Sequence, residues 1–289
     1  MNKFFIECGR QLDHIPVPPN SLQDVNIRFT ADGKDAINKL MNHLNLHPED
    51  EVYIVSTFDA VYVSKCVTCS IFNHAKPSKV LTDKTKAIYI IHDHGFPFTS
   101  MPEMIKLGKK LNIPIIEDCA HSITSKYIGK DGVIGSESDY TIFSFRKVFP
   151  VAVGGIGFKS ENEFMSFNSD PHLNNSQEIL WHLSKSSEYH SQRFINYSLL
   201  TDLTKKHVHV YKPIDHKISP YCFSIRHPDP NSFRNLFNIE HANAFECVSW
   251  YGLPIVSFPC HQLMPEQIVL ELAEYINQTA QKYKNENLD

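Results

Sequence analysis

The chain has 289 residues, of which 42% are hydrophobic, and its 28 basic and 32 acidic side chains give a formal net charge of −4. This size suits one large domain with an appendage, or two modest domains. No basic block stands out, which argues against a nucleic-acid partner, and no apolar run approaches the roughly 20 residues of a membrane helix. The first seven residues carry too short an apolar stretch for a signal peptide, so we expect a cytoplasmic protein with no membrane partner.

Alternating helices and strands are predicted for the first half of the chain. A helix is expected to open at residues 32–34, because apolar residues follow at helical spacing. Residues 59–71 are ambiguous, since their place between strands favours a helix and their β-branched content favours a strand. The remaining predicted elements are strands at 52–55, 87–91 and 113–116 and a helix at 101–111. This alternation implies a mostly parallel sheet with right-handed crossovers.

The second half of the chain has a different character. Residues 160–192 are polar with few periodic apolar positions, so a loop or domain connection is predicted there. The elements expected after it are a helix near 190–205, short strands at 207–211 and 221–226, and an amphipathic helix at 265–282. We therefore expect a large α/β domain over residues 1–175, with an irregular N-terminal extension, and a smaller α+β domain over residues 176–289.

Two motifs have the spacing of metal ligands. Cys66 and Cys69 form a CxxC pair, but no second ligand pair accompanies it, so two small hydrophobic residues in a buried segment are the preferred interpretation. The imidazoles of His92 and His94 could converge on an ion if this segment were a strand. Because Gly95 follows directly, with Phe and Pro after it, we expect a loop without fixed geometry. No metal site is predicted.

Asp118 and Lys147 point to a specific chemistry. Asp118 ends an apolar strand, and Lys147 lies in a loop that leads to the pair Gly154 and Gly155. An acid so placed can keep a pyridine nitrogen protonated, while a lysine can form an imine with an aldehyde cofactor. In parallel sheets the ligand crevice lies beyond the carboxyl ends of the strands, where Asp118 would sit. These residues predict the use of pyridoxal 5′-phosphate.

Several motifs in the same order resemble those of the DegT/DnrJ/EryC1/StrS sugar aminotransferases. The matching segments are residues 33–34, 117–121, 127–130, the region of Asp139, 143–145 and 255–259. The most characteristic is 117–121, an acid pair followed by two small residues and a histidine. Motifs that recur in order are more specific than any one of them alone. The resemblance implies the aspartate-aminotransferase fold, which is fold type I of the pyridoxal-phosphate enzymes.

The resemblance also implies roles at the reactive end of the cofactor. Lys147 would be the Schiff-base lysine and would later shuttle a proton, although an ordinary surface lysine is the alternative. Asp118 would pair with the pyridine nitrogen, or alternatively cap a helix. His121 would contact the ring or its phenolic oxygen, or simply be a buried core histidine. Phe58 could stack on the ring, and core packing explains it as well.

At the phosphate end, the hydroxyl of Ser144 and the main-chain amides of Gly33 and Lys34 would bind, helped by the helix dipole. Some features depart from the family pattern. Asp32 stands where a small hydroxyl residue is usual, and its carboxylate would repel a phosphate unless it turned away to cap the helix. Two residues are missing between Ser144 and Lys147, the middle of the chain is short, and no segment resembles the one through which a second subunit completes the phosphate site.

The predicted activity is transamination of a nucleotide-linked keto-sugar, with an amino-acid donor such as glutamate, in a homodimer. Surface-polysaccharide or antibiotic amino-sugar synthesis is the implied pathway. Two alternatives stay open: a sugar dehydratase using the same cofactor, which the presence of Lys147 disfavours, and a catalytically silent relative that binds a nucleotide-sugar or a partner, which Asp32 and the short middle section favour.

Overall fold

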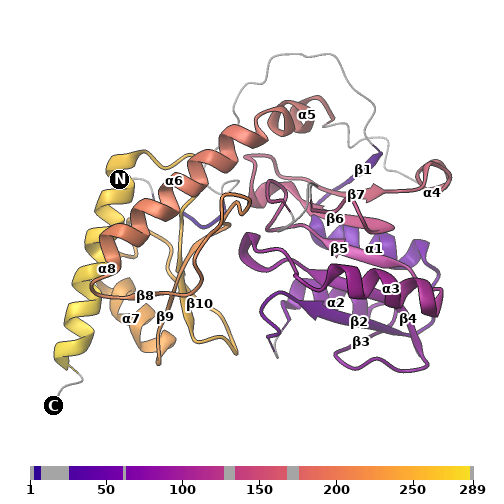
Figure 1. Ribbon diagram of the computed structural model, residues 1–289, viewed down its shortest axis with the longest axis horizontal. Coiled ribbons are helices and arrows are strands. Elements are labelled where there is room, and N and C mark those ends of the chain that lie inside the picture. Colours follow the sequence, from indigo (N-terminus) through magenta and orange to yellow (C-terminus); the bar gives the residue numbers. More distant parts are fainter. Residues whose placement is uncertain (1–2, 8–25, 61–62, 127–133, 168–175, 287–289) are drawn as a thin grey trace.

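The computed structural model describes residues 3–7, 26–60, 63–126, 134–167 and 176–286. The 127–130 motif and most of the N-terminal extension lie outside these residues. Two sheets organise the chain (Figure 1). The larger has seven strands in the order β1-β7-β6-β5-β4-β2-β3, and the smaller has four in the order β10-β11-β9-β8. The mostly parallel α/β architecture predicted from the sequence is thereby confirmed.

The strands of the larger sheet are parallel from β3 to β6, whereas β7 runs antiparallel to both β6 and β1. Their bounds are β1 Ile27–Thr30, β2 Glu51–Ser56, β3 Lys76–Ser78, β4 Thr85–Ile91, β5 Ile115–Asp118, β6 Tyr140–Ser144 and β7 Gly154–Phe158. Strand β4 is central and almost entirely buried, which explains its unbroken apolar sequence, because a parallel strand covered on both faces shows no alternation.

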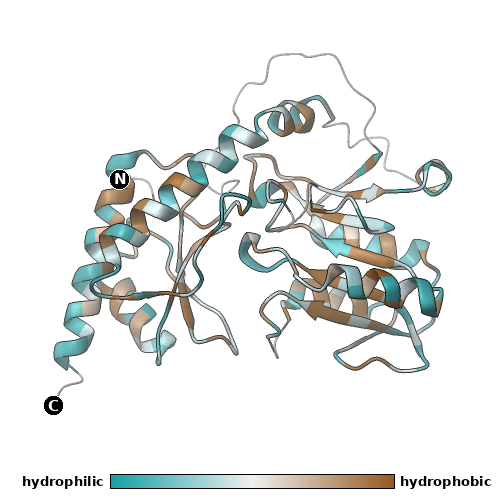
Figure 2. Ribbon diagram, in the orientation of Figure 1, coloured by the Kyte–Doolittle hydropathy of each residue, from teal (hydrophilic) through white to brown (hydrophobic). Residues whose placement is uncertain are grey.

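Helices cover both faces of this sheet (Figure 1). They are α1 Gly33–His43, α2 Lys65–Phe72 and α3 Met101–Leu111, with the short 3-10 turns η2 Asp93–Gly95 and η3 Phe145–Lys147. Helices α1 and α2 share a core with Val52, Ile54 and Tyr89, whereas α3 packs on Ile88 and Ile90 of the opposite face. Figure 2 shows the apolar residues concentrated in these strands. Among the described residues, no helix is both long and apolar enough to cross a bilayer.

Helix α2 settles the ambiguity over residues 59–71, whose later part is helical. The interpretation of its cysteine pair was wrong, however. Cys66 and Cys69 are exposed, because Val67 and Ile71 are the residues that α2 buries and positions three apart share the opposite face. His92 and His94 lie outside β4, which ends at Ile91, as expected. They do have a fixed geometry, however, since both are buried and Asp93–Gly95 form the turn η2.

The smaller sheet and its helices form the second core. Its elements are β8 His209–Val210, β9 Phe223–Arg226, β10 Val248–Ser249, β11 Ile255–Phe258, α6 Ser186–Thr204, α7 Pro230–His241 and α8 Glu266–Glu286. Apolar residues of α6, α7 and α8 pack on β9 and β11. Helix α6 runs from the larger sheet to the smaller one (Figure 1). Near the start of the chain, Phe4 forms a parallel bridge with Phe245 and packs on this same core.

The prediction of a loop over residues 160–192 was wrong. Helices α4 Glu161–Ser166 and α5 Ser176–Ser184 lie there, and α6 begins at Ser186. Helix α4 has no fully buried residue. Ile179 of α5 is fully buried in a cluster with Val148 and Phe149, and Leu183 packs against the same cluster. His182 of α5 is also buried and stacks on Phe149. Such short helices carry too few core positions to show a periodic pattern in the sequence.

Candidate active site

A cavity of about 610 Å³ opens at the carboxyl ends of β4, β5 and β6, a size typical of small-molecule sites. The start of α1, the segment after β10 and the N-terminal Glu7 complete its walls. Of the site residues predicted from the sequence, six line this cavity: Gly33, Lys34, Asp118, His121, Ser144 and Lys147. The lysine and the aspartate on which the predicted chemistry depends therefore face a common space.

Asp118 is held in a defined position at the end of β5. Its Oδ2 accepts a 2.8 Å hydrogen bond from the hydroxyl of Tyr89, and its Oδ1 accepts one of 3.0 Å from the amide of Ala120. Burial raises the pKa of Asp118, while these two hydrogen bonds and the charge of Lys147 oppose the rise. A cationic group beside the carboxylate would reverse the effect of burial, so the aspartate is suited to a protonated ring nitrogen.

Lys147 ends the short turn η3, which directly follows β6. Its Nζ lies 3.2 Å from Nε2 of His121 and 3.3 Å from Oε1 of Glu7, and it lies 5.4 Å from the ring centre of Tyr221. The side chain is 26% exposed and lines the cavity. Its role as the Schiff-base lysine stays a prediction.

The position of His121 is fixed by contacts with Tyr221 and His94. Its ring is stacked on Tyr221, with 4.1 Å between ring centres and 9° between planes, and its Nδ1 accepts a long hydrogen bond of 3.4 Å from the amide of His94. Burial lowers the pKa of His121 well below its usual value, and the charge of Lys147 adds to this. A neutral imidazole is therefore fixed beside the lysine amine.

The start of α1 forms the opposite end of the cavity. Oδ1 of Asp32 accepts a 2.8 Å hydrogen bond from the amide of Asp35, so its carboxylate caps the helix. The sequence analysis named this capping as the condition under which Asp32 would not repel a phosphate. Gly33 lies against Ser144, and a Cβ on the glycine would be 3.0 Å from the serine Cβ. Amides at a helix start carry partial positive charge, and here Gly33 and Lys34 line the same cavity as Ser144.

Phe58 is not among the residues that line the cavity, and its surroundings match the core packing that the sequence analysis left open beside a cofactor role. Its amide donates to Oδ2 of Asp93 at 3.1 Å, in the turn after β2. Its ring packs edge-on against His94 and Tyr211, with centroid distances of 5.1 and 5.2 Å. The turn that follows β2 therefore directs the ring into aromatic packing between the two sheets.

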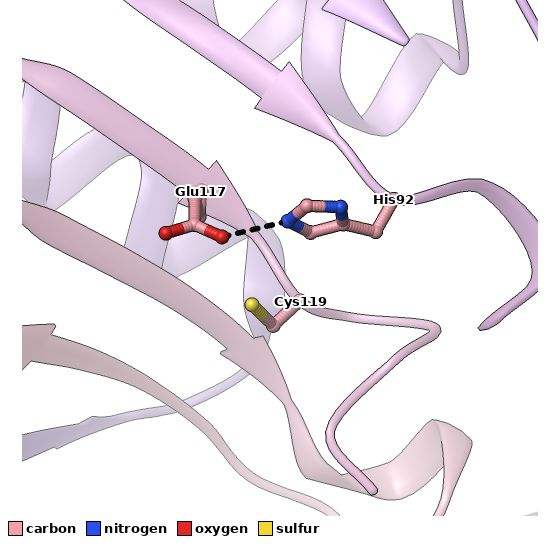
Figure 3. Close-up of side chains that lie close together, drawn as sticks. All are labelled: His92, Glu117 and Cys119. Carbon is pink, nitrogen blue, oxygen red and sulfur yellow. Dashed lines mark hydrogen bonds and ion pairs between the residues drawn. The ribbon is translucent and has the colours of Figure 1, made fainter. Parts of the chain in front are cut away.

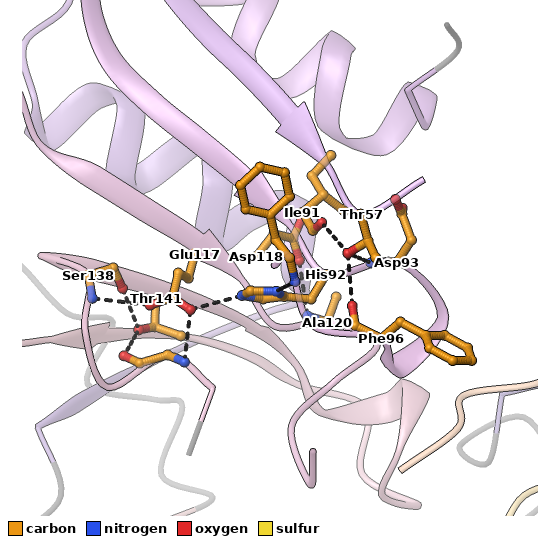
Figure 4. A network of polar contacts seen from close by, with 12 residues as sticks. Thr57, Ile91, His92, Asp93, Phe96, Glu117, Asp118, Ala120, Ser138 and Thr141 are labelled. Carbon is orange, nitrogen blue, oxygen red and sulfur yellow. Dashed lines mark hydrogen bonds and ion pairs between the residues drawn. The ribbon is translucent and has the colours of Figure 1, made fainter. Parts of the chain in front are cut away.

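A buried cluster of His92, Glu117 and Cys119 has ligand atoms within 4.8 Å of one another (Figure 3). Nδ1 of His92 accepts from the amide of Phe98 at 2.9 Å, so its Nε2 carries the proton and donates to Glu117 at 2.8 Å. Amides of Gly135 and Ser138 also donate to this carboxylate (Figure 4). Hydrogen bonds thus account for the cluster, which braces the ends of β4 and β5.

Some cavity residues were not predicted as site residues. Glu7 comes from the N-terminal segment, and Tyr89 acts from the neighbouring strand through its bond to Asp118. Trp250 lines the cavity, with its ring centre 4.5 Å from that of His94. The acidic Glu7 among apolar neighbours was visible in the sequence, but nothing local related it to Lys147.

The sheet order, the lysine after β6 and the aspartate at the end of β5 define a transferase fold of the pyridoxal-phosphate type, fold type I. Residues 30–164 match the DegT/DnrJ/EryC1/StrS aminotransferase family. This match covers a little under half of the chain, and over that segment it bears out the resemblance seen in the sequence.

Curated relatives match the chain over shorter stretches. GDP-perosamine synthase of Escherichia coli O157:H7 is 40% identical over 78 residues, which cover 26% of this chain and 21% of that protein. UDP-N-acetyl-3-dehydro-alpha-D-glucosamine 3-aminotransferase of Acidithiobacillus ferrooxidans is 32% identical over 132 residues, covering 40% and 34%. The matches thus span about a fifth to a third of these relatives' length.

Solved structures resemble the chain over most of its length. The aminotransferase TlmJ of Streptoalloteichus hindustanus superposes with a TM-score of 0.73 at 15% identity, covering 90% of this chain and 87% of that one. PseC of Helicobacter pylori, an aminotransferase involved in pseudaminic acid biosynthesis, gives a TM-score of 0.71 at 14% identity, with 89% and 87% covered. At these identities the likeness establishes the fold.

Proposed function

We propose that the protein is a pyridoxal-phosphate-dependent aminotransferase that transfers an amino group to a nucleotide-linked keto-sugar. The observation that carries the proposal is that Lys147 and Asp118 line the same cavity. The residues present fit the cofactor. The amine of Lys147 lies beside the neutral imidazole of His121, and the charge of that amine opposes the rise that burial causes in the pKa of Asp118. Gly33, at the start of α1, leaves space that a Cβ would fill.

When bound, pyridoxal phosphate supplies an aldehyde and an electron-withdrawing ring that stabilises negative charge at the substrate carbon. Asp118 would hold the proton of the ring nitrogen, with Tyr89 and the Ala120 amide fixing its carboxylate. Nζ of Lys147 would be the covalent anchor and, once released, would move a proton at the substrate carbon. His121, kept neutral by burial, would orient the lysine amine and contact the cofactor ring.

The other end of the cavity would bind the phosphate. The Ser144 hydroxyl and the amides of Gly33 and Lys34 are hydrogen-bond donors at the start of α1, and the helix dipole favours an anion there. Because the Asp32 carboxylate accepts a hydrogen bond from the Asp35 amide and so caps α1, its negative charge is stabilised by the helix backbone. This arrangement weakens the argument for a silent family member that Asp32 suggested in the sequence.

The substrate class is supported by the names of relatives, which include a GDP-perosamine synthase and a transaminase of a UDP-linked amino sugar. Glutamate as the amino donor and a homodimer are parts of the proposal that follow from the family resemblance. A cytoplasmic location, and the division into domains at residues 1–175 and 176–289, are parts of it that follow from the sequence patterns. The packing of α5 on Phe149 and of Phe4 on the second core indicates contacts across that division.

Cofactor attachment can be tested by absorbance and mass. We expect the purified protein with added pyridoxal phosphate to absorb in the visible violet, and borohydride to bleach this band and fix the cofactor mass on the peptide that contains Lys147. Lys147→Ala should show no fixed mass, whereas Lys39→Ala, on α1 beyond the cavity, should behave as the unchanged protein. A protein that stays colourless and unlabelled would favour the silent alternative.

The substrate can then be found by incubating the loaded protein with glutamate and a panel of keto-sugar nucleotides, with products read by mass. We expect one member of the panel to gain an amino group in place of its keto oxygen while glutamate is converted to its keto acid. Loss of water from the sugar without transfer of nitrogen would instead identify the dehydratase.

A further inference from the structure

The N-terminal segment delivers a carboxylate to the cavity. The amide of Phe4 donates to the carbonyl of Ala244 and its carbonyl accepts from the amide of Glu246, both at 2.7 Å. The amide of Ile6 donates to Oε2 of Glu246 at 2.9 Å. These bonds fix the segment along the smaller domain, and the next residue, Glu7, lines the cavity. A residue far from Lys147 in sequence is thereby placed beside it.

The carboxylate of Glu7 forms ion pairs with two cationic side chains. Only 9% of the residue is exposed, and its two oxygens meet different partners. Oε2 lies 3.1 Å from Nη2 of Arg146, and Oε1 lies 3.3 Å from Nζ of Lys147. A carboxylate removed from water is stable only when positive groups or hydrogen-bond donors compensate for its lost hydration. The oxygen facing Lys147 is therefore a position in which a cation is favoured.

We propose that Glu7 is the group of this site that binds the ammonium of an amine ligand. The inference rests on the proposed function, in which Nζ of Lys147 is engaged by the cofactor. Oε1 of Glu7 then loses the ammonium that contacts it here, while Arg146 can stay on Oε2. A primary ammonium that enters the cavity restores the lost contact, and the amino donor of a transamination carries such a group. Glu7 would thus select amines and position them next to the lysine.

The competing explanation is that Glu7 only ties the N-terminal segment to η3. The two explanations differ in what happens when the lysine is shortened. If Glu7 binds ammonium groups, Lys147→Ala leaves a site that a small ammonium ion can fill. If Glu7 is only a tether, its bond to Arg146 suffices and an added ammonium has no special effect.

The test uses propylammonium, which reproduces the atoms that Lys147→Ala removes, and 1-propanol, which has a similar shape without the charge. Thermal unfolding of the cofactor-free Lys147→Ala protein is followed while each compound is added, with sodium chloride matching the ionic strength. A ligand that binds only the folded chain raises the midpoint, by about 2 °C for each kcal/mol of linkage. We expect a saturable rise of about 2 to 4 °C with propylammonium and none with propanol.

Two further variants make the test specific. Glu7→Gln combined with Lys147→Ala keeps the shape of the site and removes its charge, so it should lose the preference for propylammonium. Lys39→Ala opens a half-exposed pair with Asp35 on α1, and should show no response because water hydrates that carboxylate. The proposal is overturned if propanol stabilises Lys147→Ala as well as propylammonium does, or if the Glu7→Gln combination keeps the preference.

The test is independent of the proposed cofactor, since none is added. A positive ammonium response in a protein that stays colourless with pyridoxal phosphate would support the Glu7 site and contradict the aminotransferase. The opposite pair of results would support the aminotransferase and contradict the role of Glu7.

Discussion

The hydroxyl of Tyr89 donates a hydrogen bond of 2.8 Å to Oδ2 of Asp118, and both side chains are buried between neighbouring strands. The tyrosine thus stabilises the charged form of the carboxylate that we propose meets the ring nitrogen of the cofactor. Hydrogen bonds to charged groups contribute about 1.5 to 3 kcal/mol, which sets the scale of the first prediction.

Tyr89→Phe should weaken the affinity for pyridoxal phosphate by about tenfold, because one such bond to Asp118 is lost. Asp118→Asn should weaken it further, since the charge itself is removed. Affinity is measured by titrating the cofactor and following absorbance. Tyr140→Phe is the control, because that tyrosine lies on β6 outside the cavity. Equal effects of the two tyrosine variants would contradict the role assigned to Tyr89.

Gly154→Ala should destabilise the protein by about 3 kcal/mol, because a Cβ there would collide with the carbonyl of Asp32 and lie 2.7 Å from the amide nitrogen of Gly33. It should also weaken cofactor binding, since the start of α1 must shift. Gly157→Ala on the same strand meets only side-chain atoms, the nearest at 3.1 Å, and should cost about 1 kcal/mol. Urea denaturation measures both changes, and a similar cost for the two variants would count against the close approach at Gly154.

His94 should make stability depend on pH. Burial, with a smaller effect from the charge of Lys147, lowers the pKa of His94 to about 3, whereas the unfolded chain protonates it near its ordinary value of about 6.5. His94 is therefore neutral in the folded state. Its contribution to the stability is fully present above about pH 6.5 and is lost as the pH drops toward 3. His94→Asn suits the left-handed backbone at this position, where φ is 54°.

In that variant the free energy of unfolding should fall less steeply over the same pH range, because about one proton fewer is taken up on unfolding. The slope is measured from urea midpoints at several pH values, with the unchanged protein beside it. Parallel slopes in the two proteins would show that other groups cause the pH dependence.

Arg193 should be essential for joining α6 to the cavity wall. This buried guanidinium donates to the carbonyl of Pro220 at 3.0 Å and to Oε1 of Gln262 at 2.7 Å, and Gln262 donates in turn to the carbonyl of Val148, next to Lys147. Arg193→Lys cannot keep these bonds together and should cost about 3 kcal/mol in urea unfolding. Arg234→Lys, on the more accessible α7, should change stability by about 0.5 kcal/mol; a comparable loss there would refute the special place of Arg193.

Where the sequence was a good guide, a local pattern carried the information. The apolar run of β4 and the helical spacing of α1, α3 and α8 identified those elements. The motif that contains Asp118 and the position of Lys147 identified residues that share a cavity. The sequence could not decide between the two interpretations of Phe58, because the backbone there is held by a bond between its amide and Asp93, which no spacing in the sequence encodes.

Other features depend on contacts between distant segments. Helix α4 was missed because it has no buried residue, and α5 because one of its buried side chains, His182, is polar and gives no apolar pattern beside Ile179. Glu7 could not be assigned a role, because its place follows from the bridge between Phe4 and Phe245. The stacking of His121 on Tyr221 likewise joins the two sheets, and only the folded chain brings those rings together.

The bridge formed by Phe4 also affects how the protein should be prepared. Loss of residues 3–7 would remove the bonds to Ala244 and Glu246, and with them the carboxylate of Glu7 from the cavity wall. Protein for ligand measurements should therefore keep this segment intact, and a shortened form would serve as a comparison that lacks that carboxylate.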